Sequence, residues 1–173
     1  MGHSERLRNT LSDSEASQLV GQFLVGGEYE ITGVISRGET GVVLEAKQRT
    51  WNKTVAIKLM LAHRLTDTRL RRFQREVDLL SSLNHPNIVR VSGCGVEQNL
   101  PYFVMDYVSG KTFEQLVAEH LREHSAPPDY DEMARILGSV ANALSYCHSQ
   151  GVIHRDVKAS NIVIQGTFEH AVL

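Results

Sequence analysis

One polar segment near the end of the chain, residues 154–161, constrains the fold more than any other stretch. It reads HRDVKASN and follows a helical pattern over residues 131–148, with a break at Gly151 between the two. An apolar run over residues 162–164 comes directly after it. A stretch this polar between a helix and a strand predicts a loop held by rigid elements, where functional side chains are often found.

Three side chains of this loop can converge on one small anionic group. Asp156 can accept a proton, the Lys158 ammonium can neutralise phosphate charge, and the amide oxygen of Asn161 can bind a hard cation. The alternative is a polar loop in which Asp156 forms an ordinary ion pair with Arg155. The rest of the chain has to decide between these two interpretations.

The composition is that of a soluble globular domain without an excess of basic residues. Of 173 residues, 42% are hydrophobic and 22% are charged, and the formal net charge is −2. This balance gives no electrostatic reason to expect nucleic acid as a partner. No apolar run is long enough for a membrane segment. Because Cys94 and Cys147 form no CxxC pair, we expect neither a zinc site nor a disulfide, and we expect a cytoplasmic location.

The amino-terminal part of the chain changes character at Tyr29. Residues 1–28 are polar and rich in Ser and Glu, which predicts a flexible leader. Strands are expected over residues 29–35 and 42–47, with Gly38 and the nearby Gly41 at the tip of the hairpin between them. Glycines there let the backbone approach an anion closely. A plain β-turn explains these glycines equally well when they are taken alone.

A lysine is embedded in the third expected strand, residues 54–60. A charge such as that of Lys58 is costly in an apolar strand unless it is paired or reaches water. A helix over about residues 66–83 offers a partner, because Glu76 lies on the flank of its apolar stripe. That stripe consists of Leu70, Phe73, Val77 and Leu80. The alternative is an edge-strand lysine that reaches solvent.

The remaining pattern predicts strands over residues 88–91 and 102–105 and a helix over residues 112–123. His120 and His124 stand four residues apart on that helix, a spacing that can bind a metal ion. No third ligand is close in the sequence, so we expect this pair to face solvent. The helix before the polar loop should turn these side chains inward: Met133, Ile136, Leu137, Val140, Leu144 and Cys147.

Taken in order, these motifs resemble the eukaryotic-type (Hanks-type) serine/threonine protein kinases. The hairpin matches G-x-G-x-x-G-x-V except that Ser36 replaces the first glycine, residues 55–58 read VAIK, and the loop matches H-R-D-x-K-x-x-N. The resemblance covers about residues 29–173 and implies an α+β fold. It implies an antiparallel five-stranded N-lobe sheet with one main helix over about residues 29–108. The first helices and the catalytic loop of a truncated helical C-lobe would occupy about residues 109–173.

The resemblance also implies a role for individual residues. Asp156 would orient the substrate hydroxyl and accept its proton, Lys158 would neutralise charge on the phosphoryl group, and Asn161 would hold Mg²⁺. Lys58, positioned by an ion pair with Glu76, would hold the α- and β-phosphates of ATP. The other nucleotide contacts would be Ser36, Arg37, Gly38, Gly41, Val43, Ala56, Met105, Asp106 and Val108. Met105 would be the gatekeeper, and the residues after it would form the hinge that binds adenine.

The implied reaction is transfer of the γ-phosphoryl group of ATP, with Mg²⁺, to a Ser or Thr hydroxyl of a protein substrate. Lys158, two residues after the aspartate, favours Ser/Thr over Tyr as the acceptor. Its combination with Arg155 is less typical of small-molecule kinases, and Arg155 itself is expected to be structural or regulatory. The alternative is a non-catalytic module that binds a nucleotide or a partner protein.

The family's next motif is not found in this sequence. No Asp-Phe-Gly, which carries the main Mg²⁺-binding aspartate of the family, follows the strands expected over residues 162–165 and 170–173. We therefore expect an N-terminal fragment of a kinase in which the apolar stripe of the 131–148 helix is partly exposed. We also expect little or no phosphoryl transfer by these 173 residues alone.

Overall fold

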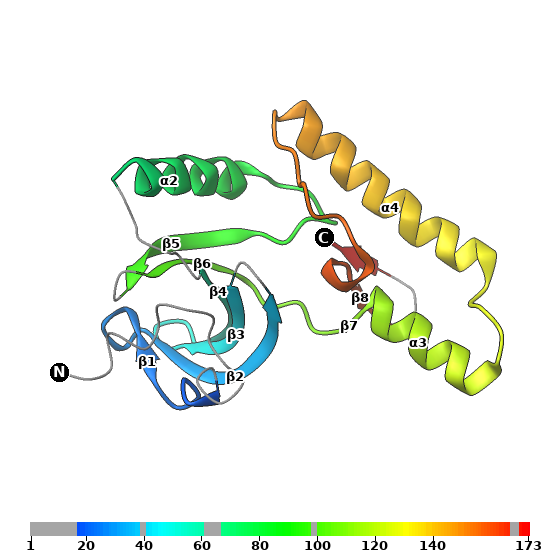
Figure 1. The fold of residues 1–173 in the computed structure, drawn as a ribbon, viewed down its shortest axis with the longest axis horizontal. Coiled ribbons are helices and arrows are strands. Elements are labelled where there is room, and N and C mark those ends of the chain that lie inside the picture. The colour runs from blue at the N-terminus through cyan, green and yellow to red at the C-terminus, as the bar shows by residue number, and fades with distance from the viewer. Residues whose placement is uncertain (1–16, 39–40, 61–66, 98–99, 167–169) are drawn as a thin grey trace. The chain divides into compact units, whose positions relative to one another are not determined.

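The computed structural model describes residues 17–38, 41–60, 67–97, 100–166 and 170–173 and, for 67–70, Arg72 and Glu76, the backbone alone. The chain forms two compact units (Figure 1). Unit 1 is made of the described residues of Met1–Ser81 together with Val91–Tyr107, and unit 2 is made of Ser82–Arg90 and Val108–Leu173. Each unit is described in turn.

In its described part, unit 1 is an antiparallel sheet with one long helix and the short 3-10 helix η2 (Val25–Gly27). Its six strands lie in the order β1-β2-β3-β4-β6-β5. They are β1 (Phe23–Leu24), β2 (Tyr29–Gly38), β3 (Gly41–Gln48), β4 (Lys53–Met60), β5 (Val91–Glu97) and β6 (Leu100–Asp106). The helix is α2 (Asp67–Ser82), which buries Val77 as its apolar stripe predicts. The expected α+β architecture is confirmed, with the two-residue β1 as a sixth strand.

The expected flexible leader is too long at its carboxyl end. Leu24 lies in β1 and is only 7% exposed, within the main apolar cluster of unit 1. The backbone amide of Gly21 donates to the carbonyl of Ile31, and the amide of Ile31 donates to the carbonyl of Gln22. The chain therefore joins the sheet before Tyr29, because a single apolar side chain and a few backbone hydrogen bonds suffice to attach it.

One face of this sheet forms the core of unit 1. Side chains alternate between the two faces of a strand, so every second residue of β3, β4 and β6 points into this core. Register pairs such as Leu44 with Ile57, and Ile57 with Val104, join these residues across the strands. The buried members are Leu24, Ile31, Val42, Leu44, Ala46, Val55, Ile57, Leu59, Tyr102 and Val104. The intervening residues therefore lie on a second face.

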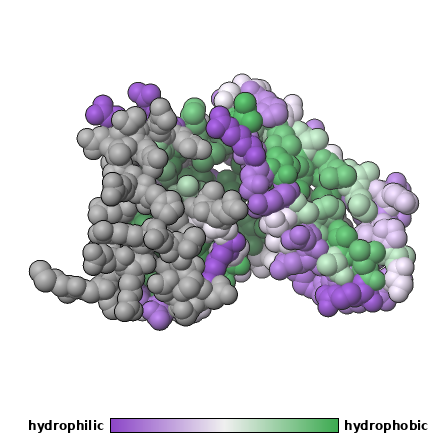
Figure 2. Space-filling model, in the orientation of Figure 1, coloured by the Kyte–Doolittle hydropathy of each residue, from purple (hydrophilic) through white to green (hydrophobic). Residues whose placement is uncertain are grey.

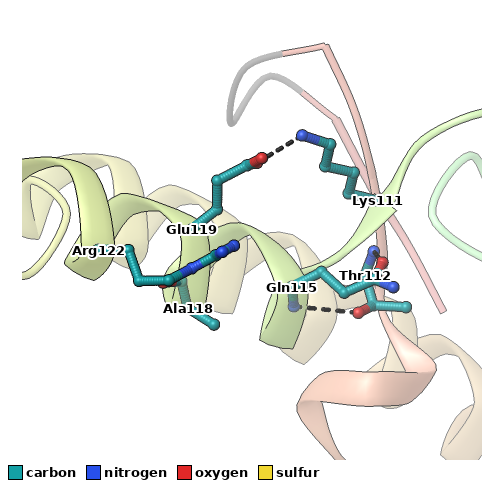
Figure 3. A network of polar contacts seen from close by, with 6 residues as sticks. All are labelled: Lys111, Thr112, Gln115, Ala118, Glu119 and Arg122. Atoms are coloured by element: carbon teal, nitrogen blue, oxygen red, sulfur yellow. Dashed lines mark hydrogen bonds and ion pairs between the residues drawn. The ribbon is translucent and has the colours of Figure 1, made fainter.

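Unit 2 combines helices with a small sheet. Its elements are β7 (Lys111–Thr112), α3 (Phe113–His124), α4 (Tyr130–Ser149), the short 3-10 helix η3 (Ala159–Asn161), β8 (Val163–Gln165) and β9 (His170–Val172). Thr112 caps α3 through a capping box with Gln115, and Lys111 forms an ion pair with Glu119 one turn further on (Figure 3). Asp129 caps α4. Both predicted helices of this region are confirmed within one or two residues.

Residues 82–90 differ from the sequence prediction. They form no strand at residues 88–91, and β5 begins only at Val91. Backbone hydrogen bonds instead join Val89 and Asn87 to Leu173, and the Asn87 side chain donates to the carbonyl of Ala171. This segment, which was expected in the N-lobe, is therefore part of unit 2. Its partners lie about 84 residues away, so local sequence patterns do not reveal them.

Helix α4 has a buried stripe and an apolar residue outside it. Ile136, Val140, Ala143 and Cys147 are buried, whereas Leu137, which was predicted to point inward, is 52% exposed. Figure 2 shows apolar residues gathered along this helix. The expectation for Leu137 is wrong because it lies one position beyond Ile136, about 100° around the helix from it. Met133 and Leu144, which were also predicted to point inward, are half-buried.

Candidate active site

The second face of the unit 1 sheet gathers residues that the sequence assigns to one site. Ser36 pairs with Val43 between β2 and β3, and Val43 pairs with Lys58 between β3 and β4. Ala56 pairs with Met105 between β4 and β6. Because directly paired residues of neighbouring strands point to the same side, these five residues share one face, opposite the core. Strand register therefore brings together residues that are up to 69 positions apart in the sequence.

Lys58 is half-buried on this face. Its Nζ atom lies 5.8 Å from the centroid of the Phe103 ring, and Phe103 is its register partner on β6. The side chain of Glu76 is outside the described residues, so the ion pair between Lys58 and Glu76 stays a prediction. Helix α2 lies beside β5 (Figure 1). Gln74 Nε2 of α2 donates to Sγ of Cys94, the β5 partner of Phe103, at 3.5 Å, so the helix contacts the same face.

The two hairpin glycines have different environments. Gly38 pairs with Gly41 where β2 meets β3, and residues 39–40 between them are outside the described part of the chain. A Cβ atom on Gly41 would lie 2.1 Å from the carbonyl oxygen of Leu59, so only glycine fits there. A Cβ atom on Gly38 would meet nothing within 4 Å. The requirement for glycine at position 41 thus comes from packing against β4.

Two of the predicted nucleotide contacts lie at register positions on the core face of the sheet. Arg37 pairs with Val42, and Asp106 pairs with Val55, and both partners belong to the core. Asp106 Oδ1 accepts from Lys53 Nζ at 2.6 Å. For Arg37 and Asp106, the backbone is therefore the part that is available to the second face. Val108, the last of the predicted contacts, lies two residues beyond the end of β6.

The polar loop of unit 2 brings its three predicted residues into contact. Asp156 Oδ2 lies 3.0 Å from Lys158 Nζ and 3.0 Å from Asn161 Nδ2, and Asn161 Nδ2 also donates to the Asp156 carbonyl (2.8 Å). The short helix η3 closes this turn, since the backbone N–H of Asn161 donates to the backbone carbonyl of Lys158. Arg155 adopts a left-handed φ of 64° next to Asp156. The amide of Asp156 in turn donates to His154 Nδ1 (3.4 Å).

The electrostatics of the loop keep its carboxylate ionised. The hydrogen bond from Lys158, followed by that from Asn161, lowers the pKa of Asp156 below its usual range. Asp156 is exposed, so a substrate can reach it. Its position and charge fit a group that accepts a hydrogen bond, and later a proton, from a hydroxyl.

The same loop offers oxygen ligands for a hard cation. Both hydrogen bonds that the Asn161 side chain forms with described residues use the amide nitrogen, so among these residues the amide oxygen is left to a metal ion. The described residues contain no group of three or more His, Cys, Asp or Glu side chains that could hold a metal by themselves. This donor set fits Mg²⁺, which keeps several waters and uses few protein ligands.

The described helices include none that is long and apolar enough to cross a membrane. His120 and His124 of α3 stack on one another, with ring centroids 4.2 Å apart. In the described part of the chain they belong to no group of three or more His, Cys, Asp or Glu side chains, and His124 is exposed as expected, whereas His120 is half-buried.

The sequence reasoning missed Phe103. It was included only as part of the strand expected over residues 102–105, whereas its register with Lys58 places it on the second face. The available signal was its position two residues before Met105, since these positions alternate with the core residues Tyr102 and Val104.

Comparison with known proteins identifies similar chains. The sequence profile described as the protein kinase domain matches residues 29–171. The probable serine/threonine-protein kinase PknB of Bifidobacterium longum is 37% identical over 151 residues, which cover 82% of this chain and 21% of that protein. Serine/threonine-protein kinase PrkC of Bacillus subtilis is 33% identical over 141 residues, which cover 81% of this chain and 21% of PrkC.

The crystal structure of the Mycobacterium tuberculosis PknI kinase domain has the same fold. It superposes with a TM-score of 0.74 at 28% identity and covers 89% of this chain and 59% of the PknI chain. The chain thus spans about a fifth of the length of the curated relatives described above.

Proposed function

We propose, from the premise that this chain belongs to the protein kinase family, that it supplies the nucleotide-binding face and the catalytic loop of a serine/threonine protein kinase. The reaction is transfer of the γ-phosphoryl group of ATP to a Ser or Thr hydroxyl of a protein. One observation carries the proposal: Lys158 and Asn161 both lie 3.0 Å from the same Asp156 carboxylate oxygen in an exposed loop.

The loop residues perform the chemistry at the acceptor. Asp156, which is ionised, accepts a hydrogen bond from the substrate hydroxyl and takes its proton as the oxygen attacks phosphorus. Lys158 neutralises charge on the phosphoryl group while it is transferred. Asn161 holds Mg²⁺ through its amide oxygen. When bound, the metal neutralises phosphate charge.

The second face of unit 1 holds the donor. Lys58 binds the α- and β-phosphates, and Gly38 and Gly41 bring the hairpin backbone close to them. Val43 and Ala56 offer apolar surface to the adenine ring. Ser36, Arg37, Met105 and Asp106 complete this set on unit 1, with the hinge contributing backbone groups. Val108, which belongs to unit 2, stays a predicted contact.

The substrate and the location follow from the same chemistry. The H-R-D-x-K pattern of the loop favours a protein Ser or Thr acceptor over tyrosine. ATP as the donor and the two free thiols, Cys94 and Cys147, suit a reducing cytoplasm.

Two measurements test the proposal. Isothermal titration of the protein with ATP and Mg²⁺ should show saturable binding that Lys58→Met weakens at least tenfold. Transfer of γ-labelled phosphate should then be measured at protein concentrations high enough to detect slow turnover, with Ser, Thr and Tyr versions of one generic peptide. Label should enter only the Ser and Thr peptides. The proposal fails if ATP does not bind, or if tyrosine is the preferred acceptor.

A further inference from the structure

Phe103 occupies the middle of a row of residues on the second face of the unit 1 sheet. In register across β4, β6 and β5, the row runs from Lys58 through Phe103 to Cys94. Gln74 of α2 contacts the far end of the row through Sγ of Cys94. The ring is thus placed between the phosphate-binding lysine and the strand that α2 touches.

The contact between Phe103 and Lys58 is of a specific kind. The Lys58 ammonium lies 5.8 Å from the centroid of the ring, within the range in which the negative face of an aromatic ring attracts a cation. Both side chains are half-buried, so water screens this attraction less than it would at a fully exposed site. None of the ion pairs between described side chains involves Lys58.

We propose that Phe103 is a positioning residue that holds the Lys58 ammonium on the second face before a nucleotide arrives. This inference rests on the proposed role of Lys58 as the ligand of the ATP phosphates. A lysine side chain is long and flexible, and ordering it when a ligand binds costs conformational freedom. A ring that already restrains the ammonium reduces this cost. The contact should therefore improve ATP affinity only when Lys58 is present.

A purely structural role for Phe103 is a distinct alternative. The apolar core of unit 1 lies on the opposite face of β6, where Tyr102 and Val104 are buried. Phe103 is not a member of that cluster and is only half-buried. Replacing the Phe103 ring should therefore change the labelling rate of Lys58 more than it changes the stability of the core. Val104→Ala, at the neighbouring position on the core face, is a matched control.

The first experiment measures Lys58 without nucleotide. The folded protein is treated briefly with an acylating reagent at one fixed pH, and mass spectrometry gives the labelling rate of Lys58 relative to the exposed Lys47. The reagent must reach the amine, so an amine that is half-buried and covered by a ring is labelled slowly. Phe103→Leu should raise the relative rate by about two- to fivefold. Phe103→Tyr, which keeps the ring, and Val104→Ala should leave it unchanged.

Two results of this experiment would overturn the proposal. One is an unchanged Lys58 rate in Phe103→Leu. The other is an equal rise in Val104→Ala, which would show that general loosening of β6 exposes the lysine. Thermal unfolding of each variant confirms that it is folded under the labelling conditions.

The second experiment tests the link to the nucleotide. Phe103→Leu should weaken binding of ATP with Mg²⁺ by about two- to fivefold in the unmutated background and have no effect in Lys58→Met. The same loss in both backgrounds would show that the ring acts independently of Lys58, which contradicts the proposal. If the unmutated protein binds no ATP, the proposed function fails, whereas the labelling experiment still decides whether Phe103 restrains Lys58.

Discussion

The two groups of candidate residues, one in each unit, are built in different ways. In unit 2, Asp156, Lys158 and Asn161 come from one segment of six residues, and one turn of 3-10 helix brings them together. In unit 1, Ser36 and Met105 share a face only because four strands pair in one register. Chemistry in the loop thus depends on local backbone geometry, and the nucleotide face depends on the fold of the whole unit.

This difference predicts opposite responses to mutation. Asp156 and Lys158 are exposed and Asn161 is half-buried, so changing Asp156 or Lys158 should alter the chemistry and leave stability nearly unchanged. On the nucleotide face, each residue is next to a core strand position, so changes there should alter binding and stability together.

The largest effect is expected for Asp156→Asn. Loss of the carboxylate removes the group that accepts the substrate proton, so the slow phosphoryl transfer to a Ser peptide by the unmutated chain should fall by about 10²-fold or more, to the detection limit. The midpoint of thermal unfolding should stay within about 1 °C, because the side chain is exposed and asparagine has the same shape. If Asp156→Asn lowered both activity and stability strongly, the Asp156 side chain would contribute to the packing of unit 2, which contradicts a purely local role.

Substitution of the hairpin glycines should show which of the two positions requires glycine for packing against β4. Gly41→Ala places a Cβ atom 2.1 Å from the Leu59 carbonyl oxygen and should lower the free energy of unfolding of unit 1 by about 1–3 kcal/mol. Gly38→Ala, in open space, is the matched control and should cost less than about 0.5 kcal/mol. Hydrogen exchange of the β3 and β4 amides measures both. Equal effects would contradict the assigned contact.

The charge on Asp156 should depend mainly on Lys158. The pKa of Asp156 is lowered first by Lys158 and then by Asn161, so Lys158→Met should raise it more than Asn161→Ala does. Because a depressed carboxyl pKa favours folding above the unfolded-state pKa, any such contribution is lost as pH falls through the lower folded-state value. NMR titration of the Asp156 carboxyl group in both variants shows which substitution raises its pKa more. The reverse order would mean that the Lys158 contact is not formed in solution.

The smallest effect is expected for the ion pair between Lys53 and Asp106. Their side chains are 56% and 40% exposed, so solvent screens the pair and its coupling energy should be about 0.2–1 kcal/mol. A double-mutant cycle with Lys53→Met and Asp106→Asn measures this value from denaturant unfolding. A coupling above about 2 kcal/mol would show that the end of β6 is held much more firmly than its exposure indicates.

The sequence predicted best what is decided locally. Alternation and helical periodicity placed β2 to β4, α3 and α4, and the spacing within residues 154–161 predicted the convergence of Asp156 with Lys158 and Asn161. Prediction of the nucleotide residues required resemblance to a family, because their proximity arises from pairing between distant strands.

The features that were missed depend on contacts between distant parts of the chain. Leu24 joins the core through β1, residues 82–90 bind the last residues of the chain, and Phe103 meets Lys58 across β4 and β6. No local pattern contains the identity of a partner that lies tens of residues away. Leu137 was misplaced for a different reason, because one helical position separates a buried side chain from an exposed one.

Protection of Lys58 by a nucleotide tests most directly the central claim that the second face of unit 1 binds ATP. The unmutated protein is acylated with and without saturating ATP and Mg²⁺, and labelling of Lys58 is compared with that of Lys47 on the same sheet. The account predicts that the nucleotide slows labelling of Lys58 at least fivefold and leaves Lys47 unchanged. Equal labelling of Lys58 with and without ATP would contradict it.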